Sequence, residues 1–204
     1  MKTLWEEFEV PADPNKIPWV IDLRHVNLLR ELVEIVQPKV AMEIGSYQGG
    51  STVAFLKAMN DLPEMRLHLV EPKPTPSLLR LIETSPHKER ITLHQCSSWE
   101  TGVRADFVFI DGDHQWPALA DLSYALAQDV PAIALHDTRA ICGGCWGAQL
   151  AAEILRDAPL RVWHCDDKER PGELTHRGFA LSFTRGEWSF DVEEALGEAF
   201  VTLA

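Results

Sequence analysis

Short apolar runs alternate with stretches of helical periodicity over most of the chain, and this alternation restricts the fold more than any other sequence feature. The runs cover 39–44, 66–71, 90–95, 106–110 and 131–135, and helical spacing of apolar residues marks 51–60, 76–84 and 117–128 between them. Both faces of the runs carry apolar residues, which is typical of parallel strands covered by helices.

The flanking segments complete this pattern. A broad apolar face predicts a helix over 25–36, ended by Pro38, and a further helix is expected over 146–156. Two late apolar runs, 160–164 and 178–184, are joined by a charged loop and predict an antiparallel hairpin at one sheet edge. We therefore predict an α/β protein: a Rossmann-like three-layer sandwich with a seven-stranded, mostly parallel sheet. Residues 1–24 are expected to form an N-terminal extension, and 25–204 a single domain.

Charge and composition exclude several classes of partner. The chain has 31 acidic and 19 basic residues in 204, a net charge of −12, which argues against nucleic acid and anionic membranes as partners. No apolar run approaches the roughly 20 residues of a membrane span, and the acidic N-terminus does not resemble a signal peptide. The four cysteines are too few for a disulfide scaffold at this length. We expect a cytoplasmic protein.

Ligands of parallel α/β sheets bind beyond the carboxyl ends of the strands, so the strand ends are the candidate site. The first run leads into Gly45-Ser46-Tyr47-Gln48-Gly49-Gly50, in which glycines allow a tight turn and close approach to a ligand. Ser51 or Thr52 is expected to cap the next helix. The segment lacks the second glycine of the dinucleotide fingerprint, which disfavours an NAD-dependent oxidoreductase. A plain strand-to-helix turn is the alternative interpretation.

The next two strand ends add polar groups. Glu71 follows the second run, where an acid can accept hydrogen bonds from ribose hydroxyls, although a solvated acid is the simpler alternative. Ser97 and Ser98 follow the third run and either flank an adenine or form a structural loop. Together the first two ends predict a nucleoside pocket.

The fourth and fifth strand ends are rich in acids and imidazoles. Asp111, Asp113 and His114 follow the fourth run, and His136 and Asp137 end the fifth. Neighbouring parallel strands would bring these ends to one edge, so Asp111 and Asp137, with His136 or Asp113, form a candidate divalent cation site. Oxygen ligands favour Mg²⁺, and an imidazole extends the choice to Mn²⁺, Fe²⁺ or Zn²⁺. Helix capping by Asp113 and a turn at Asp137 are the alternatives.

Two further features have structural interpretations. Cys142-Gly-Gly-Cys145 is compatible with zinc or redox chemistry, but without a second such motif we interpret it as a structural loop. The acid-rich tail 187–198 is expected to be a solvated helix or an oligomer contact.

The motifs resemble those of class I S-adenosylmethionine (SAM)-dependent methyltransferases over roughly residues 25–185. The segment from Glu43 to Thr52 is similar to the first motif of the metal-dependent O-methyltransferase branch, and Glu71 to its ribose-binding acid. Ile110-Asp-Gly-Asp-His114 and His136-Asp-Thr138 are similar to its fourth- and fifth-strand motifs. Within this branch the chain looks most like a small bacterial group that includes macrolide-sugar O-methyltransferases and cephalosporin-hydroxylase-like proteins.

The resemblance implies roles at individual positions. It implies that Gly45 and Gly49 pass beneath the methionine part of SAM and that Glu71 holds the ribose. The full set implied for the cofactor is Glu43, Gly45, Ser46, Tyr47, Gly49, Ser51, Glu71, Ser97, Ser98 and Asp111. Asp111, His136 and Asp137 occupy the positions of the family's cation ligands, with His136 replacing an acid. His114 stands where catechol-type enzymes have a basic lysine, so His114 is the expected catalytic base, with Asp111 beside it.

These positions predict methyl transfer from SAM to a hydroxyl of a small molecule, assisted by a divalent cation such as Mg²⁺ or Mn²⁺. A catalytically inactive, methyltransferase-like module that binds a nucleoside or a partner chain is the second interpretation. The acceptor is not encoded in a readable motif, since fold alone does not specify it. Edge-strand pairing is compatible with a homodimer.

Overall fold

The computed structural model describes residues 2–10, 21, 23–138, 145–157, 161–165, 178–183 and 201–202. The chain divides into two compact units, 1–105 and 106–204. The predicted single domain over 25–204 stays a prediction. Cys142 and the tail 187–198 lie outside the described residues. No helix among the described residues has the length and hydropathy of a membrane span.

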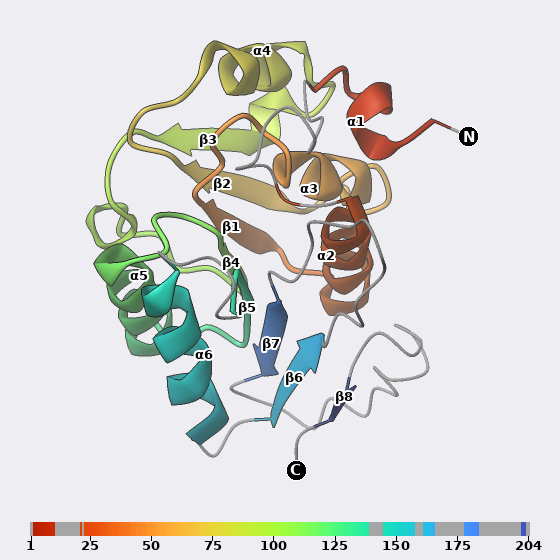
Figure 1. The fold of residues 1–204 in the computed structure, drawn as a ribbon. Helices are drawn as coiled ribbons and strands as arrows, with labels where there is room; N and C mark the ends of the chain where they lie inside the picture. Colours follow the sequence, from red (N-terminus) through yellow and green to blue (C-terminus); the bar gives the residue numbers. More distant parts are fainter. Residues whose placement is uncertain are drawn as a thin grey trace. The chain divides into compact units, whose positions relative to one another are not determined.

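The first unit is built on three parallel strands. Its elements are α1 (Leu4–Glu7), α2 (Leu23–Val36), β1 (Val40–Ile44), α3 (Thr52–Ala58), β2 (Arg66–Val70), α4 (Pro76–Thr84), η1 (Lys88–Arg90), β3 (Ile91–His94) and η2 (Ser98–Glu100). The strands lie in the order β3-β2-β1, with Ile44 opposite Val70 and Val70 opposite His94 (Figure 1). Their carboxyl ends therefore lie on one edge of the unit.

The core of this unit explains the predicted periodicities. Val26, Leu29 and Val33 of α2, at helical spacing, are fully buried, and residues 41–44 of β1 are all buried. Helices α2 and α3 pack against each other, and α1 contacts α3. The Trp5 indole donates a hydrogen bond to the Gly50 carbonyl at 3.0 Å, which fastens the N-terminal segment to the loop after β1.

The second unit combines a parallel pair with antiparallel strands. Its elements are β4 (Phe107–Ile110), α5 (Trp116–Ala127), β5 (Ala132–His136), α6 (Trp146–Asp157), β6 (Arg161–Cys165), β7 (Phe179–Phe183) and β8 (Val201–Thr202). β4 and β5 are parallel, β7 is antiparallel to β5, and β6 is antiparallel to β7. Every residue of β4, β5 and β7 is buried, as expected for strands covered on both faces.

The predicted α/β class, with parallel strands followed by an antiparallel hairpin, is confirmed. All seven predicted strands are present. The count of seven is wrong for the described residues, because the two-residue β8 adds an eighth strand beside β6. A segment this short has no period-2 pattern to detect.

Gly49 provides a test of the packing in the first unit. Its φ is +90°, and an added Cβ would lie 2.6 Å from Leu81 Cδ2. We expect Gly49→Ala to lower the free energy of unfolding by about 1–3 kcal/mol, the usual range for a strained backbone residue. Gly102→Ala is the control, because its φ is +63° but nothing lies within 4 Å of its added Cβ. Urea unfolding of both variants measures the difference. Equal decreases in the free energy of unfolding would mean that the contact with Leu81 contributes nothing to the cost of Gly49→Ala.

Candidate functional site: a glycine-rich loop and an Asp–His cluster

The loop between β1 and α3 has the backbone that its glycines predict. Gly45 and Gly49 both have φ of +90°, and Tyr47 between them has φ of +41°. The Gly45 amide donates to the Val70 carbonyl at 2.9 Å, and the Gly49 amide to the Ser46 carbonyl at 2.7 Å. The loop is thus a tight, left-handed turn at the carboxyl edge of β1 and β2.

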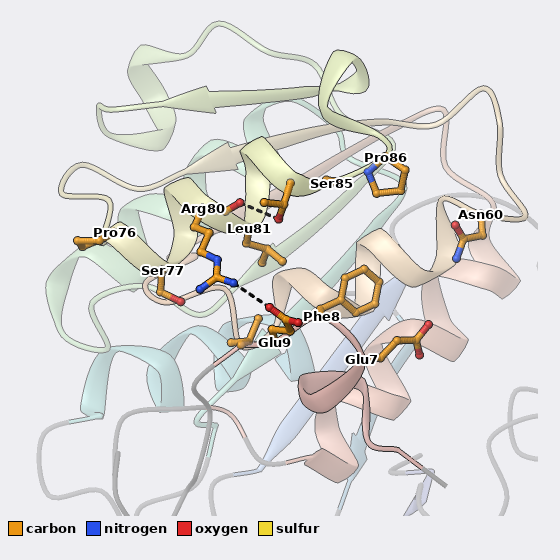
Figure 2. A pocket seen from close by; sticks show the side chains of 12 residues that line it. Glu7, Phe8, Glu9, Asn60, Pro76, Ser77, Arg80, Leu81, Ser85 and Pro86 are labelled. Carbon is orange, nitrogen blue, oxygen red and sulfur yellow. Dashed lines mark hydrogen bonds and ion pairs between the residues drawn. The ribbon is translucent and has the colours of Figure 1, made fainter.

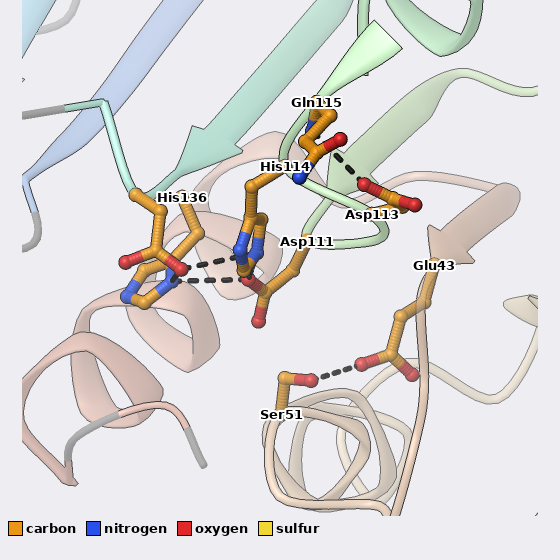
Figure 3. A network of polar contacts seen from close by, with 8 residues as sticks. Glu43, Ser51, Asp111, Asp113, His114, Gln115 and His136 are labelled. Atoms are coloured by element: carbon orange, nitrogen blue, oxygen red, sulfur yellow. Dashed lines mark hydrogen bonds and ion pairs between the residues drawn. The ribbon is translucent and has the colours of Figure 1, made fainter. Parts of the chain in front are cut away.

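Glu43 holds the base of this loop. It is fully buried, and its carboxylate accepts hydrogen bonds from Thr52 Oγ1 at 2.6 Å and from the Ser51 hydroxyl (Figure 3). The predicted helix cap at Ser51 or Thr52 is wrong: Ser51 has helical torsion angles and makes no side-chain cap bond. Because these polar groups face one another, we expect Glu43 and Ser51 to position the loop.

Two side chains of the loop, those of Ser46 and Gln48, have a buried oxygen without a hydrogen-bond partner among the described residues. Ser46 is 1% exposed, and the oxygen is that of its hydroxyl. A buried, unpartnered hydroxyl is unfavourable, so such a group in a native structure calls for an explanation, for example a functional role or a bound water or ion. The Ser46 hydroxyl therefore fits a ligand in the turn.

Glu71 is tied to the same loop. One of its carboxylate oxygens accepts from the Tyr47 amide at 2.9 Å and the other from the Lys73 amide at 3.0 Å. Each oxygen keeps a lone pair for a further donor, such as a ribose hydroxyl. Of the two predicted serines after β3, Ser98 is buried, and the Ser97 amide donates to Glu100 at 2.9 Å.

Four side chains of the second unit form a compact ring of opposite charges, which we name the Asp–His cluster: Asp111, His114, His136 and Asp137. His136 Nδ1 lies 3.0 Å from Asp111 Oδ1 and 3.4 Å from Asp137 Oδ2. His114 Nε2 lies 3.0 Å from Asp137 Oδ2 and 3.4 Å from Asp111 Oδ1. Figure 3 shows both imidazoles turned toward Asp111. Each imidazole thus touches both carboxylates.

The predicted fourth acid, Asp113, lies apart from this cluster. Its Oδ1 accepts from the Gln115 amide at 3.0 Å, which is a local turn before α5 (Figure 3). The capping alternative for Asp113 is wrong, because the N-cap position of α5 is Gln115 and no side chain caps the helix; Pro117 lies in its first turn. Asp137, in contrast, has φ of +54°, and a non-glycine residue in this region is strained.

The charges of the cluster shift its pKa values in opposite directions. Burial alone would raise the pKa of Asp111, but the charge of His136 and hydrogen bonds from both histidines hold it well below its usual value. Burial alone would lower the pKa of His136, but the charges of Asp111 and Asp137 raise it well above its ordinary value. The pKa of His114 is raised in the same way, against burial, by Asp111 and Asp137.

Two groups of potential metal-ligand atoms meet at Asp137. Asp111, His136 and Asp137 offer atoms that all lie within 4.8 Å of one another, and so do His114, Asp137 and Cys145. The first group is the predicted cation site. The second group includes Cys145, which we interpreted from the sequence as part of a structural loop. The sequence feature that could have indicated it as a ligand is the Cys142–Cys145 motif directly after the fifth strand end.

An exposed aromatic pair flanks the loop that carries His114. Trp116 and Trp146 are 68% and 46% exposed, and their ring centroids lie 6.5 Å apart. Two exposed indoles form an apolar surface of the kind that binds a ring-shaped ligand.

A separate cavity of about 710 Å³ lies in the first unit between α1 and α4 (Figure 2). It is crossed by an exposed ion pair between Arg80 and Glu9 at 2.8 Å. None of the described residues predicted for cofactor, cation or catalysis lines it. It therefore gives no support to the predicted chemistry.

Comparison with known proteins places the fold among methyltransferases. A family described as "Methyltransferase domain" matches residues 42–138, from β1 to just beyond β5. No curated protein matches the sequence.

Solved structures resemble nearly the whole chain. An O-methyltransferase from Bacillus cereus in complex with SAH is 19% identical with a TM-score of 0.72, over 91% of this chain and 92% of that one. The O-methyltransferase TomG from Streptomyces achromogenes, in complex with SAM and involved in tomaymycin synthesis, is 17% identical with a TM-score of 0.66, over 90% and 87%. The SAH-bound methyltransferase PaMTH1 from Podospora anserina is 14% identical with a TM-score of 0.64, over 90% and 86%. The chain has the α/β Rossmann-like fold of these methyltransferases.

Proposed function

We propose that the protein is a SAM-dependent methyltransferase that transfers a methyl group to a hydroxyl of a small molecule with the help of a divalent cation. The observation that carries the proposal is the loop after β1. This loop has left-handed glycines and a buried Ser46 hydroxyl without a partner among the described residues, and its Tyr47 amide is bonded to the Glu71 carboxylate at the end of β2. Similarity in fold to proteins solved with SAM or SAH supports the choice of cofactor.

The loop residues and Glu71 have different roles in binding SAM. Gly45 and Gly49 leave the backbone bare, so that a ligand can approach it closely. Ser46 supplies a hydroxyl, and Glu71 accepts from the ribose while it anchors Tyr47. When bound, SAM supplies a methyl group on a sulfonium for in-line displacement by the acceptor oxygen. Correct placement of that oxygen provides much of the rate enhancement.

Asp111, His136 and Asp137 would hold the cation. Two carboxylates suit Mg²⁺ or Mn²⁺, and the fully buried imidazole of His136 extends the choice to softer ions. A cation supplies charge that lowers the pKa of a bound hydroxyl.

His114 is the residue that accepts the hydroxyl proton in this proposal. Its side chain is 27% exposed, whereas those of His136 and Asp137 are 0% and 4% exposed, so His114 is the more accessible imidazole of the cluster. Protonation at Nε2 is stabilised by Asp111 and Asp137. Trp116 and Trp146 form the candidate surface for the acceptor ring.

The cofactor is tested by Ser46→Ala. The variant loses a hydroxyl that has no partner among the described residues, so the free protein is expected to be as stable as the wild type or more stable. Affinity for S-adenosylhomocysteine is expected to fall about 2–10-fold, the worth of one hydrogen bond. Calorimetric titration and thermal unfolding of the same samples measure both quantities. Ser123→Ala, which removes a hydroxyl bonded to the Leu119 carbonyl, is the control.

Failure of the wild type to bind S-adenosylhomocysteine would refute the proposal. Binding without turnover of any catechol, sugar or phenolic acid would favour the second candidate, a catalytically inactive nucleoside-binding module. Repeating the titration with Mg²⁺, Mn²⁺ and a chelator separates the cation from the cofactor.

A further inference from the structure

We propose that reduction of the disulfide at Cys145 creates a second metal site, formed by His114, Asp137 and Cys145, that takes Zn²⁺ or a similar thiophilic cation. The ligand atoms of these three residues all lie within 4.8 Å of one another. Cys145 is fully buried, and Asp137 is 3% exposed. An imidazole nitrogen, a carboxylate oxygen and a sulfur therefore already converge in a largely dehydrated place.

The backbone keeps Cys145 beside His114. The His114 carbonyl accepts hydrogen bonds from the Gly147 amide at 2.9 Å and the Ala148 amide at 3.3 Å, so the first turn of α6 is fastened to the loop after β4. The approach is so close that a Cβ on Gly147 would lie 1.7 Å from the Gln115 carbonyl oxygen. The convergence of the three ligands is thus built into the packing of α6.

The oxidation state of Cys145 decides whether this site exists. In the structure Cys145 is disulfide-bonded, and a disulfide sulfur carries no negative charge and is a poor metal ligand. A dithiol reductant breaks the S–S bond by supplying two electrons and two protons, and is itself oxidised to a disulfide. The Cys145 thiol then loses its proton as it binds the cation, because thiolate is the ligand form. Zn²⁺ accepts Cys, His and Asp together and leaves a fourth position for water.

Because Asp137 belongs to both ligand groups, the two sites compete. A cation held by His114, Asp137 and Cys145 removes Asp137 from the group with Asp111 and His136. It also occupies the His114 nitrogen. The second site can exist whether or not the proposed function is correct. Its effect on activity rests on the proposed function: if the protein is that methyltransferase, Zn²⁺ inhibits the reduced enzyme.

The site is tested with Co²⁺, whose thiolate complexes have a near-ultraviolet charge-transfer band. The full chain is reduced with a dithiol, freed of it by gel filtration without oxygen, and titrated with Co²⁺ alongside the oxidised protein. We expect the band in the reduced wild type and its loss in the oxidised protein and in Cys145→Ser. Cys96→Ser is the matched control, since Cys96 is a free cysteine of the first unit, and it should keep the band. His114→Gln should keep the band with weaker Co²⁺ binding, which serves as the test if Cys145→Ser does not fold.

A reduced wild type without the band, a band that survives in Cys145→Ser, or His114→Gln with unchanged Co²⁺ affinity would overturn the proposal. Titration of the oxidised protein with S-adenosylhomocysteine is run in parallel. If the oxidised protein does not bind S-adenosylhomocysteine, the proposed function is contradicted. The second metal site is still decided by the Co²⁺ titration alone.

Discussion

Replacing His114 by glutamine is expected to lower kcat by about 10²–10⁴-fold, the usual contribution of a general base. Glutamine keeps much of the size of the side chain but cannot take the hydroxyl proton at neutral pH. His114 belongs to the Asp–His cluster, whereas the candidate cofactor residue Ser46 lies in the loop after β1, and Glu71, after β2, is bonded to that loop. We therefore expect affinity for S-adenosylhomocysteine to stay unchanged. Steady-state turnover with an acceptor found by screening, together with calorimetry, measures both effects.

The matched control is His87→Gln. His87 lies outside the cluster, where its ring contacts Arg90 at 2.8 Å and Asn60 at 2.9 Å, so turnover should be preserved. Undiminished turnover in His114→Gln would remove His114 from the mechanism. A loss of turnover that is matched by lost cofactor affinity would indicate a structural role.

The pKa of His114 gives this assignment a pH signature. In the cation-free protein the carboxylates of Asp111 and Asp137 raise this pKa above its ordinary value, despite burial. A base works when neutral, so turnover should fall as the pH drops through the pKa of His114. A divalent cation between the two carboxylates offsets their charge, and we expect it to move that pKa downward. NMR titration of the His114 ring with and without Mg²⁺ measures the shift, and an upward shift would contradict the assignment.

Patterns local in sequence predicted most of the fold. Buried strands and amphipathic helices have periods that are visible over a few residues, so β1 to β7 and α2 to α6 could be located. The left-handed turn at Gly45 and Gly49 followed for the same reason, since glycine is the residue that adopts positive φ readily.

Contacts between distant segments set the limits of the prediction. Glu43 and Ser51 stay predicted cofactor residues, but the bond between their side chains was not predicted, because it forms only when the loop brings the start of α3 back to β1. Cys145 reaches His114 through backbone bonds between α6 and the loop after β4, and no local pattern in the sequence encodes that contact. The ends of β4 and β5 could be predicted as neighbours, but not the ring of two imidazoles and two carboxylates that they form.

Asp111→Asn tests whether this ring holds a cation. Asp111 contributes a carboxylate oxygen 3.0 Å from His136 Nδ1 and belongs to the group with His136 and Asp137. An amide is a weaker ligand without charge. We expect affinity for Mg²⁺ or Mn²⁺ to fall by more than the ~10–100-fold typical of losing a mere outer-shell partner. Cation-stimulated turnover should be lost with it. Calorimetric titration of the cation, followed by turnover over a range of cation concentrations, measures both.

Asp113→Asn is a closely matched control, because it makes the same change of charge two residues away in the same loop. Asp113 accepts from the Gln115 amide and lies outside the cluster, so cation affinity should stay near the wild-type value. Equal losses of cation affinity in the two variants would show that cation binding depends on the net charge of the loop and not on the Asp111 carboxylate itself. Unchanged affinity in Asp111→Asn would mean that the carboxylates serve to neutralise the two imidazoles. His114 would then have to accept the proton without metal assistance, a mechanism that predicts turnover insensitive to a chelator.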